Sequence, residues 1–382
     1  MPAPVIVSSQ NDLQLSPEDG TSKFSSEYLP RITGLPSGGF VASWGDFLPS
    51  PTDSAPNYPY GRDADGQMSI MVRAFGADGK AIARAFPAAT DFSGGSDAAD
   101  IVSLTGGKVL AAWSAATNTA SRIGARIVDP LTGLPVGAEI VVARGGGTSN
   151  LTELKLIQAV AMPNGSAGVL YIDGGADPNT LRLAVVESDG TLGTSRTLAA
   201  NGLPSTAGSD DVAVALQGPN AGILAVVTQQ FPAAPKVEYF KLDGSAAALP
   251  PLSLGTMGST ATMAARPDGG LAIALMSGAT AFTIIRTDAA GARVGSDLSV
   301  GFNAGSPDLL ALPDGGLLLA GTAFNTVDIL GQRIKADGTL DGAAVRLDAA
   351  PSGPQTAPSL ALTGNGTAVV AFVDERSTLD SG

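Results

Sequence analysis

The segment LPDGGLLLAG (Leu312 to Gly321) decides the fold, because its pattern recurs seven times along the chain. In each copy a Gly-containing turn leads into a short apolar segment, and successive turns lie about 45 to 70 residues apart. This spacing is typical of the blades of a β-propeller, whereas solenoid repeats are usually shorter. The other copies are LPSGGFVASW (Leu35 to Trp44), LTGGKVLAAW (Leu104 to Trp113), MPNGSAGVLYI (Met162 to Ile172), QGPNAGILAVV (Gln217 to Val227), RPDGGLAIAL (Arg266 to Leu275) and LTGNGTAVVAFV (Leu362 to Val373).

A second tight turn follows in most repeats, as in KADG (Lys335 to Gly338), and a further strand-like segment follows it, as in AAVRLD (Ala343 to Asp348). Asp-Gly turns are typical of β-hairpins, since Gly adopts positive φ without a Cβ clash. Turn residues recur about every 8 to 12 positions, which excludes long helices. Only TELKLIQAV (Thr152 to Val160) is compatible with a short helix. Each repeat therefore predicts four antiparallel strands, the content of one blade.

We therefore expect an all-β protein in which residues 1–382 form a single β-propeller of about seven four-stranded blades. Only Asp374–Gly382 follow the last apolar strand, so APVIVSS (Ala3 to Ser9) is expected to complete the last blade and close the ring. Closure removes exposed sheet edges. One strand is still missing, so the natural protein is expected to continue past Gly382. The expected blades are residues 28–95, 97–147, 151–204, 207–256, 258–303, 305–350, and 355–382 together with 3–10.

The composition excludes several classes of function. A net charge of −13 without clustered Lys or Arg argues against nucleic acid as a partner. The absence of His and Cys excludes catalytic triads that contain His and metal sites built on thiolates. No apolar run reaches the roughly 18 residues of a membrane-spanning helix. The Glu residues share no position among the repeats, so no acid–base pair is marked and no catalytic residue is assigned.

An insertion in the first repeat, residues 46–67, is the best candidate for a binding loop. Long loops on rigid scaffolds often bind partners. This loop gathers the aromatic residues Phe47, Tyr58 and Tyr60, whose rings could contact a sugar or a protein. Packing of these rings back over the blade is the alternative interpretation.

The same insertion contains the candidate metal ligands Asp63 and Asp65. They stand at alternate positions before a Gly, which is part of a calcium-loop pattern without its later bidentate Glu. A solvated acidic turn is the alternative. No other cofactor is expected.

Further aspartates stand just before the expected first strands of two repeats. They would cap turns there or bind a cation at one mouth of the propeller. These residues are Asp97, Asp100, Asp210 and Asp211.

The sixth and seventh repeats resemble the propeller-like repeats of large secreted Gram-negative surface proteins, including calcium-dependent repeat-containing adhesins and haemolysin-type proteins. The resemblance is carried by LPDGGLLLAG…VDILGQRIKADGTLDGAAVRLD (Leu312 to Asp348) and by LTGNGTAVVAFVDERS (Leu362 to Ser377). The second to fourth repeats lack the GQR element, and only Trp44 and Trp113 keep the usual tryptophan. The nonapeptide calcium repeats of that group are absent, so its calcium-dependent activity does not carry over.

The resemblance implies a secreted or cell-surface location, with a protein or a glycan at a cell surface as partner. Three functions remain open. The first is a non-catalytic scaffold or binding module of an adhesin or surface-layer-type protein, and the second is a structural subunit of a larger extracellular assembly. The third is a calcium-dependent hydrolase or lyase, because propellers host many unrelated activities.

Overall fold

A computed structural model describes twelve segments of the chain: residues 27–47, 68–89, 95–116, 120–146, 154–174, 180–199, 212–228, 234–255, 261–276, 281–301, 304–348 and 354–374. Backbone contacts divide the chain into two compact units. The N-terminal unit comprises Gln14–Asn201 and Thr363–Asn365. The C-terminal unit comprises Met1–Leu13, Gly202–Leu362 and Gly366–Gly382. None of the helices in these segments is long and apolar enough to cross a membrane.

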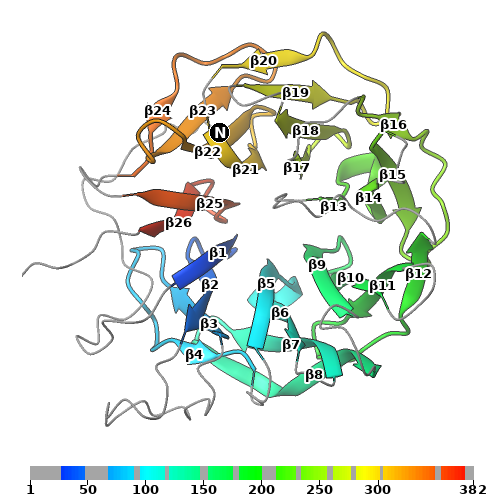
Figure 1. Cartoon of the computed structure of the whole chain (residues 1–382), viewed down its shortest axis with the longest axis vertical. Helices are drawn as coiled ribbons and strands as arrows, with labels where there is room; N and C mark the ends of the chain where they lie inside the picture. The colour runs from blue at the N-terminus through cyan, green and yellow to red at the C-terminus, as the bar shows by residue number, and fades with distance from the viewer. Residues whose placement is uncertain are drawn as a thin grey trace, which may run out of the picture. The chain divides into compact units, whose positions relative to one another are not determined.

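The N-terminal unit contains three four-stranded antiparallel sheets, in which each strand pairs with the next strand of the sequence (Figure 1). A single 3-10 turn, Thr105–Gly107, connects β5 to β6. The strands are β1 (Glu27–Gly34), β2 (Phe40–Phe47), β3 (Met68–Phe75) and β4 (Phe86–Pro87); β5 (Gly95–Ser103), β6 (Val109–Ala116), β7 (Ala120–Asp129) and β8 (Leu134–Gly146); β9 (Leu154–Ala161), β10 (Ala167–Asp173), β11 (Thr180–Val186) and β12 (Arg196–Ala199).

The C-terminal unit repeats this arrangement three times and ends in a two-stranded hairpin. A 3-10 turn, Gly218–Asn220, precedes β14. The strands are β13 (Ala213–Ala215), β14 (Ile223–Thr228), β15 (Lys236–Lys241) and β16 (Leu252–Ser253); β17 (Ala261–Ala265), β18 (Leu271–Met276), β19 (Phe282–Arg286) and β20 (Leu298–Val300); β21 (Ala304–Ala311), β22 (Leu317–Ala323), β23 (Ile329–Ile334) and β24 (Val345–Arg346); β25 (Gln355–Leu362) and β26 (Ala368–Asp374).

The sheets are blades of the β-propeller type, but six of them have four strands, so the prediction of seven four-stranded blades is wrong. The seventh repeat forms only the β25–β26 pair among the described residues. The strand expected to complete it, residues 3–10, lies outside the described residues, and closure of a ring by that strand is not supported.

The compatibility of Thr152 to Val160 with a helix was also misleading, because most of this segment forms β9. Leu154 and Leu156 are buried whereas Lys155 between them is exposed. This alternation is the pattern of a strand that faces a core on one side.

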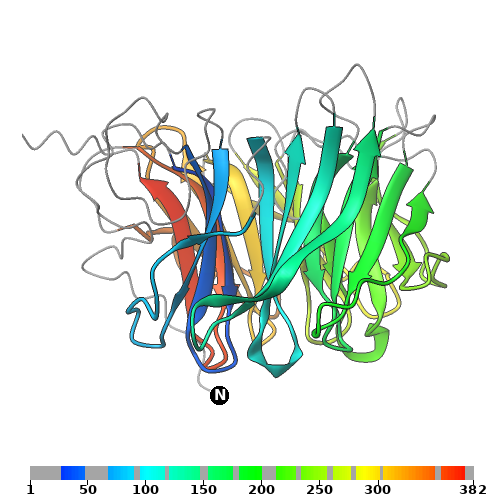
Figure 2. The ribbon, with the colours of Figure 1, turned by 90° about the horizontal axis from the view of Figure 1, so that it is seen from below.

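Glycine turns fix the strand order at the positions expected from the repeats. In the sixth sheet, the Gly315 N–H donates to the Leu312 carbonyl (3.0 Å), and the Leu312 N–H donates to the Gly316 carbonyl (2.9 Å). Gly315 has φ +83°, which an L-residue rarely adopts. Figure 2 shows such tight turns joining neighbouring strands at one edge of the sheets.

The core of the N-terminal unit is built on the buried second strands, and Trp113 of β6 is its largest fully buried side chain. Trp113 packs in one cluster with Val41, Ile70 and Phe86 of the first sheet. Its indole lies against Gly124 of β7, where an added Cβ would be 2.6 Å from Trp113 Cε2. The neighbouring strand therefore needs a glycine at this position.

Aspartates link the first strands of successive sheets, and one of them, Asp308, is buried. Asp308 of β21 accepts hydrogen bonds from the N–H of Leu309 (2.7 Å) and from the N–H of Leu360 in β25 (2.5 Å). Asp100 of β5 repeats this arrangement with Ile101 (2.8 Å) and with Ala159 of β9 (2.8 Å). Each carboxylate thus satisfies one N–H of its own strand and one N–H of the next sheet.

This position corrects the expectation for Asp100, which lies inside a strand and not before it. Its carboxylate accepts backbone N–H groups, so its observed role is to join two sheets. Asp97 also belongs to β5, of which the structure describes the backbone at that residue. Asp210 and Asp211 lie outside the described residues.

Candidate functional site

The binding loop predicted in the first repeat falls almost entirely outside the described residues. Phe47 is the last residue of β2, and the structure describes its backbone. Tyr58, Tyr60, Asp63 and Asp65 lie in the connection between β2 and β3, beyond the described segments. These five residues remain predictions.

Carboxylates in the described segments are dispersed along the strands and turns. No group of three or more Asp, Glu, His or Cys residues there is arranged to hold a metal ion. Many of the turn aspartates accept hydrogen bonds from nearby N–H groups, as Asp337 does from Thr339 (2.9 Å). That bond holds the pKa of Asp337 below its ordinary value, as expected for a carboxylate that caps a turn.

The connection between β22 and β23, residues 324–328, combines an exposed aromatic residue, an ion pair and a residue with positive φ. It occupies the same place in the sixth sheet as the predicted binding loop does in the first, between the second and third strands. The Val327 N–H donates to the Ala323 carbonyl (2.8 Å), and the Ala323 N–H donates to the Asp328 carbonyl (2.9 Å). These two bonds close the loop into a tight turn.

Phe324 presents an aromatic ring to solvent from this loop, with 52% of the residue exposed. The ring lies on Gly305 of β21, where an added Cβ would be 2.9 Å from ring atoms Cε1 and Cζ. One side of the ring therefore has a fixed support in the sheet. An exposed aromatic ring on a rigid base offers a flat apolar surface to a ligand.

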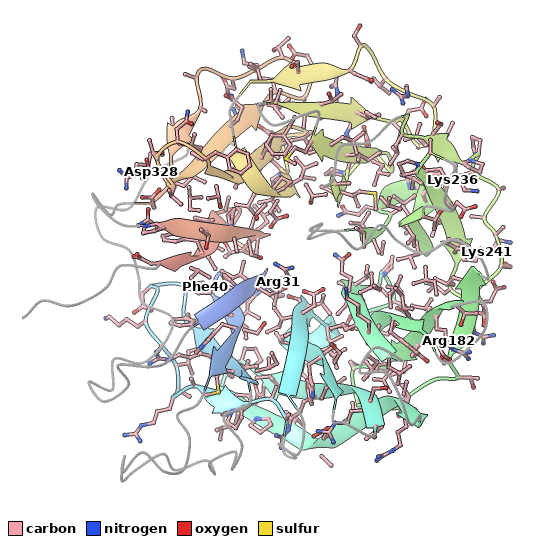
Figure 3. All side chains as sticks on the ribbon, in the orientation of Figure 1. Arg31, Phe40, Arg182, Lys236, Lys241 and Asp328 are labelled. Carbon is pink, nitrogen blue, oxygen red and sulfur yellow. The ribbon has the colours of Figure 1, made fainter. Side chains whose placement is uncertain are left out.

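An ion network anchors the other end of the loop. Asp328, labelled in Figure 3, lies 3.0 Å from the guanidinium of Arg346 in β24. Arg346 also donates through Nε to Asp348 (2.7 Å), and Asp348 accepts the N–H of Ile329 (2.8 Å). Burial lowers the pKa of Arg346, but its hydrogen bond to Asp348 and the charges of Asp348 and Asp328 raise it overall. Arg346 thus stays charged and holds the loop to the outer strand.

Backbone strain gathers around this loop. Positive φ angles occur at Val327 (57°) in the loop, at Ser306 (46°) and at Ala357 (52°), and these are the non-glycine residues with positive φ in the described segments. Ser306 and Ala357 lie at irregularities in β21 and β25, the strands that flank the loop's own hairpin. A β-branched residue such as Val327 is strongly disfavoured there. Strain of this kind often marks functional sites.

Phe324 was not singled out from the sequence. The loop is short and has no acidic or aromatic cluster of the kind that made residues 46–67 conspicuous. The position of Phe324 within its repeat could have marked it as a candidate, because it lies in the connection between the second and third strands. Its support on Gly305 depends on strand packing that the spacing of repeats does not reveal.

Comparisons with known proteins identify the fold but no family. No family model and no curated protein sequence matches the chain. The chain is similar in structure to the BP39L lectin from Burkholderia pseudomallei, with 12% identity over 91% of this chain and 97% of the other and a TM-score of 0.52. A protein of unknown function from Dyadobacter fermentans has 12% identity over 92% of both chains and a TM-score of 0.50.

An enzyme is also among the similar structures. The Hadza microbial sialidase Hz136 has 11% identity over 86% of this chain and 67% of its own, with a TM-score of 0.50. At such low identities these likenesses show the fold alone, and the fold hosts both binding proteins and enzymes. The chain is therefore an all-β protein with propeller-type blades, and the proteins of similar structure include a lectin and a sialidase.

Proposed function

We propose that this protein is a non-catalytic glycan-binding module, and that the loop of residues 324–328 is its binding site. The observation that carries the proposal is the exposed ring of Phe324 on its glycine support. Sugar rings have an apolar face that packs against aromatic rings, and their hydroxyl groups need polar partners nearby. Asp328 and Arg346 supply polar groups at the end of the same loop.

The similar lectin structure supports a binding function for such a fold. We also propose that this module belongs to a secreted adhesin or surface-layer-type protein, as expected from the sequence. A secreted or cell-surface location, with glycans or proteins of a cell surface as partners, forms part of it.

Phe324→Ala is expected to weaken glycan binding about tenfold, which corresponds to about 1.4 kcal/mol of lost ring contact. The measurement is a glycan array with wild type, followed by calorimetric titration of the best glycan into wild type and variant. Phe324→Tyr keeps the ring and is expected to bind as wild type does. Leu340→Ala removes another exposed apolar side chain of the same sheet and serves as the matched control. Equal affinities of wild type and Phe324→Ala would contradict this site.

The similar sialidase makes a hydrolase the second candidate. The same wild-type protein is therefore incubated with the array glycans and with sialylated glycans, and released sugar is measured by chromatography. A non-catalytic module leaves every glycan intact. Turnover of any glycan would replace the proposal with an enzymatic function.

We also propose Asp63 and Asp65 as calcium ligands, since alternate carboxylates before a glycine are part of a calcium loop. Added calcium is then expected to raise the melting temperature of wild type by mass action, and a chelator to reverse the rise. Asp63→Ala/Asp65→Ala is expected to melt at one temperature with and without calcium. If calcium raises the melting temperature of this variant as much as that of wild type, the metal binds at other residues and this proposal is wrong.

A further inference from the structure

Two buried polar side chains next to the loop of residues 324–328 have atoms without a hydrogen-bond partner in the described structure. Gln355 of β25 is fully buried, and its Oε1 accepts no hydrogen bond. Thr322 of β22 is 8% exposed, and its Oγ1 has no partner. Buried polar groups in native proteins are nearly always satisfied, so each exception needs an explanation such as a water or a ligand.

Both side chains face the space between the sixth sheet and the β25–β26 hairpin. Leu318 and Ala320 of β22 pack with Leu360 of β25 in one cluster. Side chains alternate along a strand, so Thr322 lies on the same face as Ala320.

The same alternation places Gln355 on the opposite wall of this space. Val370 of β26 packs against the cluster, and Asp374 follows it on the same face of the strand. Gln355 is paired with Asp374 across the hairpin, and its Nε2 donates to Asp374 Oδ1 (3.4 Å). The Gln355 side chain therefore points from the hairpin toward the sixth sheet. The Thr322 side chain points from the sixth sheet toward the hairpin.

The loop of residues 324–328 covers this end of the space. Thr322 lies two residues before Phe324 and is paired with Gly305, on which the Phe324 ring lies. The Gln355 N–H donates to the Val327 carbonyl (2.7 Å). Val327 is the strained residue of the loop, so the covering conformation is held against an unfavourable backbone angle.

We propose that Thr322 and Gln355 form a hydroxyl subsite of the glycan site, which opens when residues 325–327 of the loop turn aside while the Phe324 ring stays on Gly305 and Asp328 stays on Arg346. This inference rests on the proposed glycan-binding function. A sugar hydroxyl is both donor and acceptor, so it would donate to Gln355 Oε1 and accept from the Thr322 hydroxyl. Asp374 accepts the hydrogen bond of Gln355, so the subsite lies beside a carboxylate and is expected to take neutral sugars in preference to acidic ones.

Thr322→Val is the sharpest variant, because valine keeps the shape of threonine and removes only the hydroxyl. Binding of the best neutral array glycan is expected to fall about tenfold, as for the loss of one buried hydrogen bond to a ligand. The melting temperature is expected to stay equal or rise, since a buried hydroxyl without a partner is removed. Thr262→Val, which removes another buried Oγ1 without a partner in the fifth sheet, is the matched control and is expected to bind as wild type does.

Deoxy forms of the same neutral glycan identify the hydroxyl. One of them is expected to bind wild type about tenfold more weakly and to bind Thr322→Val with no further loss. Sialylated forms are expected to bind more weakly than the neutral glycan.

Wild-type affinity in Thr322→Val, or a fall in its melting temperature of several degrees, would overturn the subsite and leave the Phe324 site standing. Stronger binding of sialylated forms would likewise overturn it. If wild type binds no array glycan, the proposed function itself fails.

Discussion

Replacing Asp308 with alanine is expected to lower the free energy of unfolding of the C-terminal unit by about 3 kcal/mol. The carboxylate is 4% exposed and accepts the N–H groups of Leu309 and Leu360. The shorter side chain leaves both buried N–H groups without this acceptor, and each such loss costs about 1–3 kcal/mol. Denaturant unfolding followed by circular dichroism measures the change.

Two further variants separate the charge from the hydrogen bonds. Asp308→Asn keeps one acceptor oxygen and places an NH2 group against the second N–H, so an intermediate loss of stability is expected. Asp297→Ala removes an exposed partner of Arg293 in the same unit, and less than about 1 kcal/mol is expected. If Asp308→Ala lowers the free energy of unfolding no more than Asp297→Ala does, the hydrogen bonds of Asp308 to the two strands do not stabilise the unit.

Trp113→Ala is expected to destabilise the N-terminal unit by about 4 kcal/mol. The side chain is fully buried between the first and second sheets, and its removal leaves a cavity lined by Val41, Ile70 and Phe86. Far-UV circular dichroism follows the transition, because the mutation removes one of the two tryptophans.

The tight contact of Trp113 with Gly124 gives an independent test of the same core. Gly124→Ala places a methyl group against the indole and is expected to cost about 1–3 kcal/mol through overpacking. Combined with Trp113→Ala, that methyl group enters the cavity, so the double variant is expected to be more stable than the sum of the two losses predicts. Simple additivity would contradict the contact.

Much of the fold could be predicted from local patterns. The turns at Leu312–Gly316 and Lys335–Gly338 were expected from their glycines, because only the turn chemistry of a few residues is needed to place them. The short apolar segments after the turns form second strands, and Ala111 and Ala112 in one of them are fully buried. The predicted number of four-stranded sheets was wrong, because the prediction completed the last repeat with residues 3–10, a pairing that the period of the repeats does not establish.

The site depends on tertiary contacts that repeat spacing does not contain. Asp100 was expected to cap a turn or to bind a cation, but its carboxylate accepts an N–H of the next sheet. Phe324 acquires its role from Gly305, which is nineteen residues earlier in the chain and adjacent only through strand pairing. The buried Thr322 and Gln355 are likewise ordinary strand residues until the hairpin packs against the sixth sheet.

The most direct test of the glycan-binding account is a crystal structure of wild type with the strongest neutral glycan of the array. The account predicts a sugar ring stacked on Phe324, with one hydroxyl within hydrogen-bond distance of Thr322 Oγ1 and Gln355 Oε1 and with residues 325–327 displaced. A sugar bound elsewhere, for example at residues 46–67, with the loop of residues 324–328 unchanged, would contradict it.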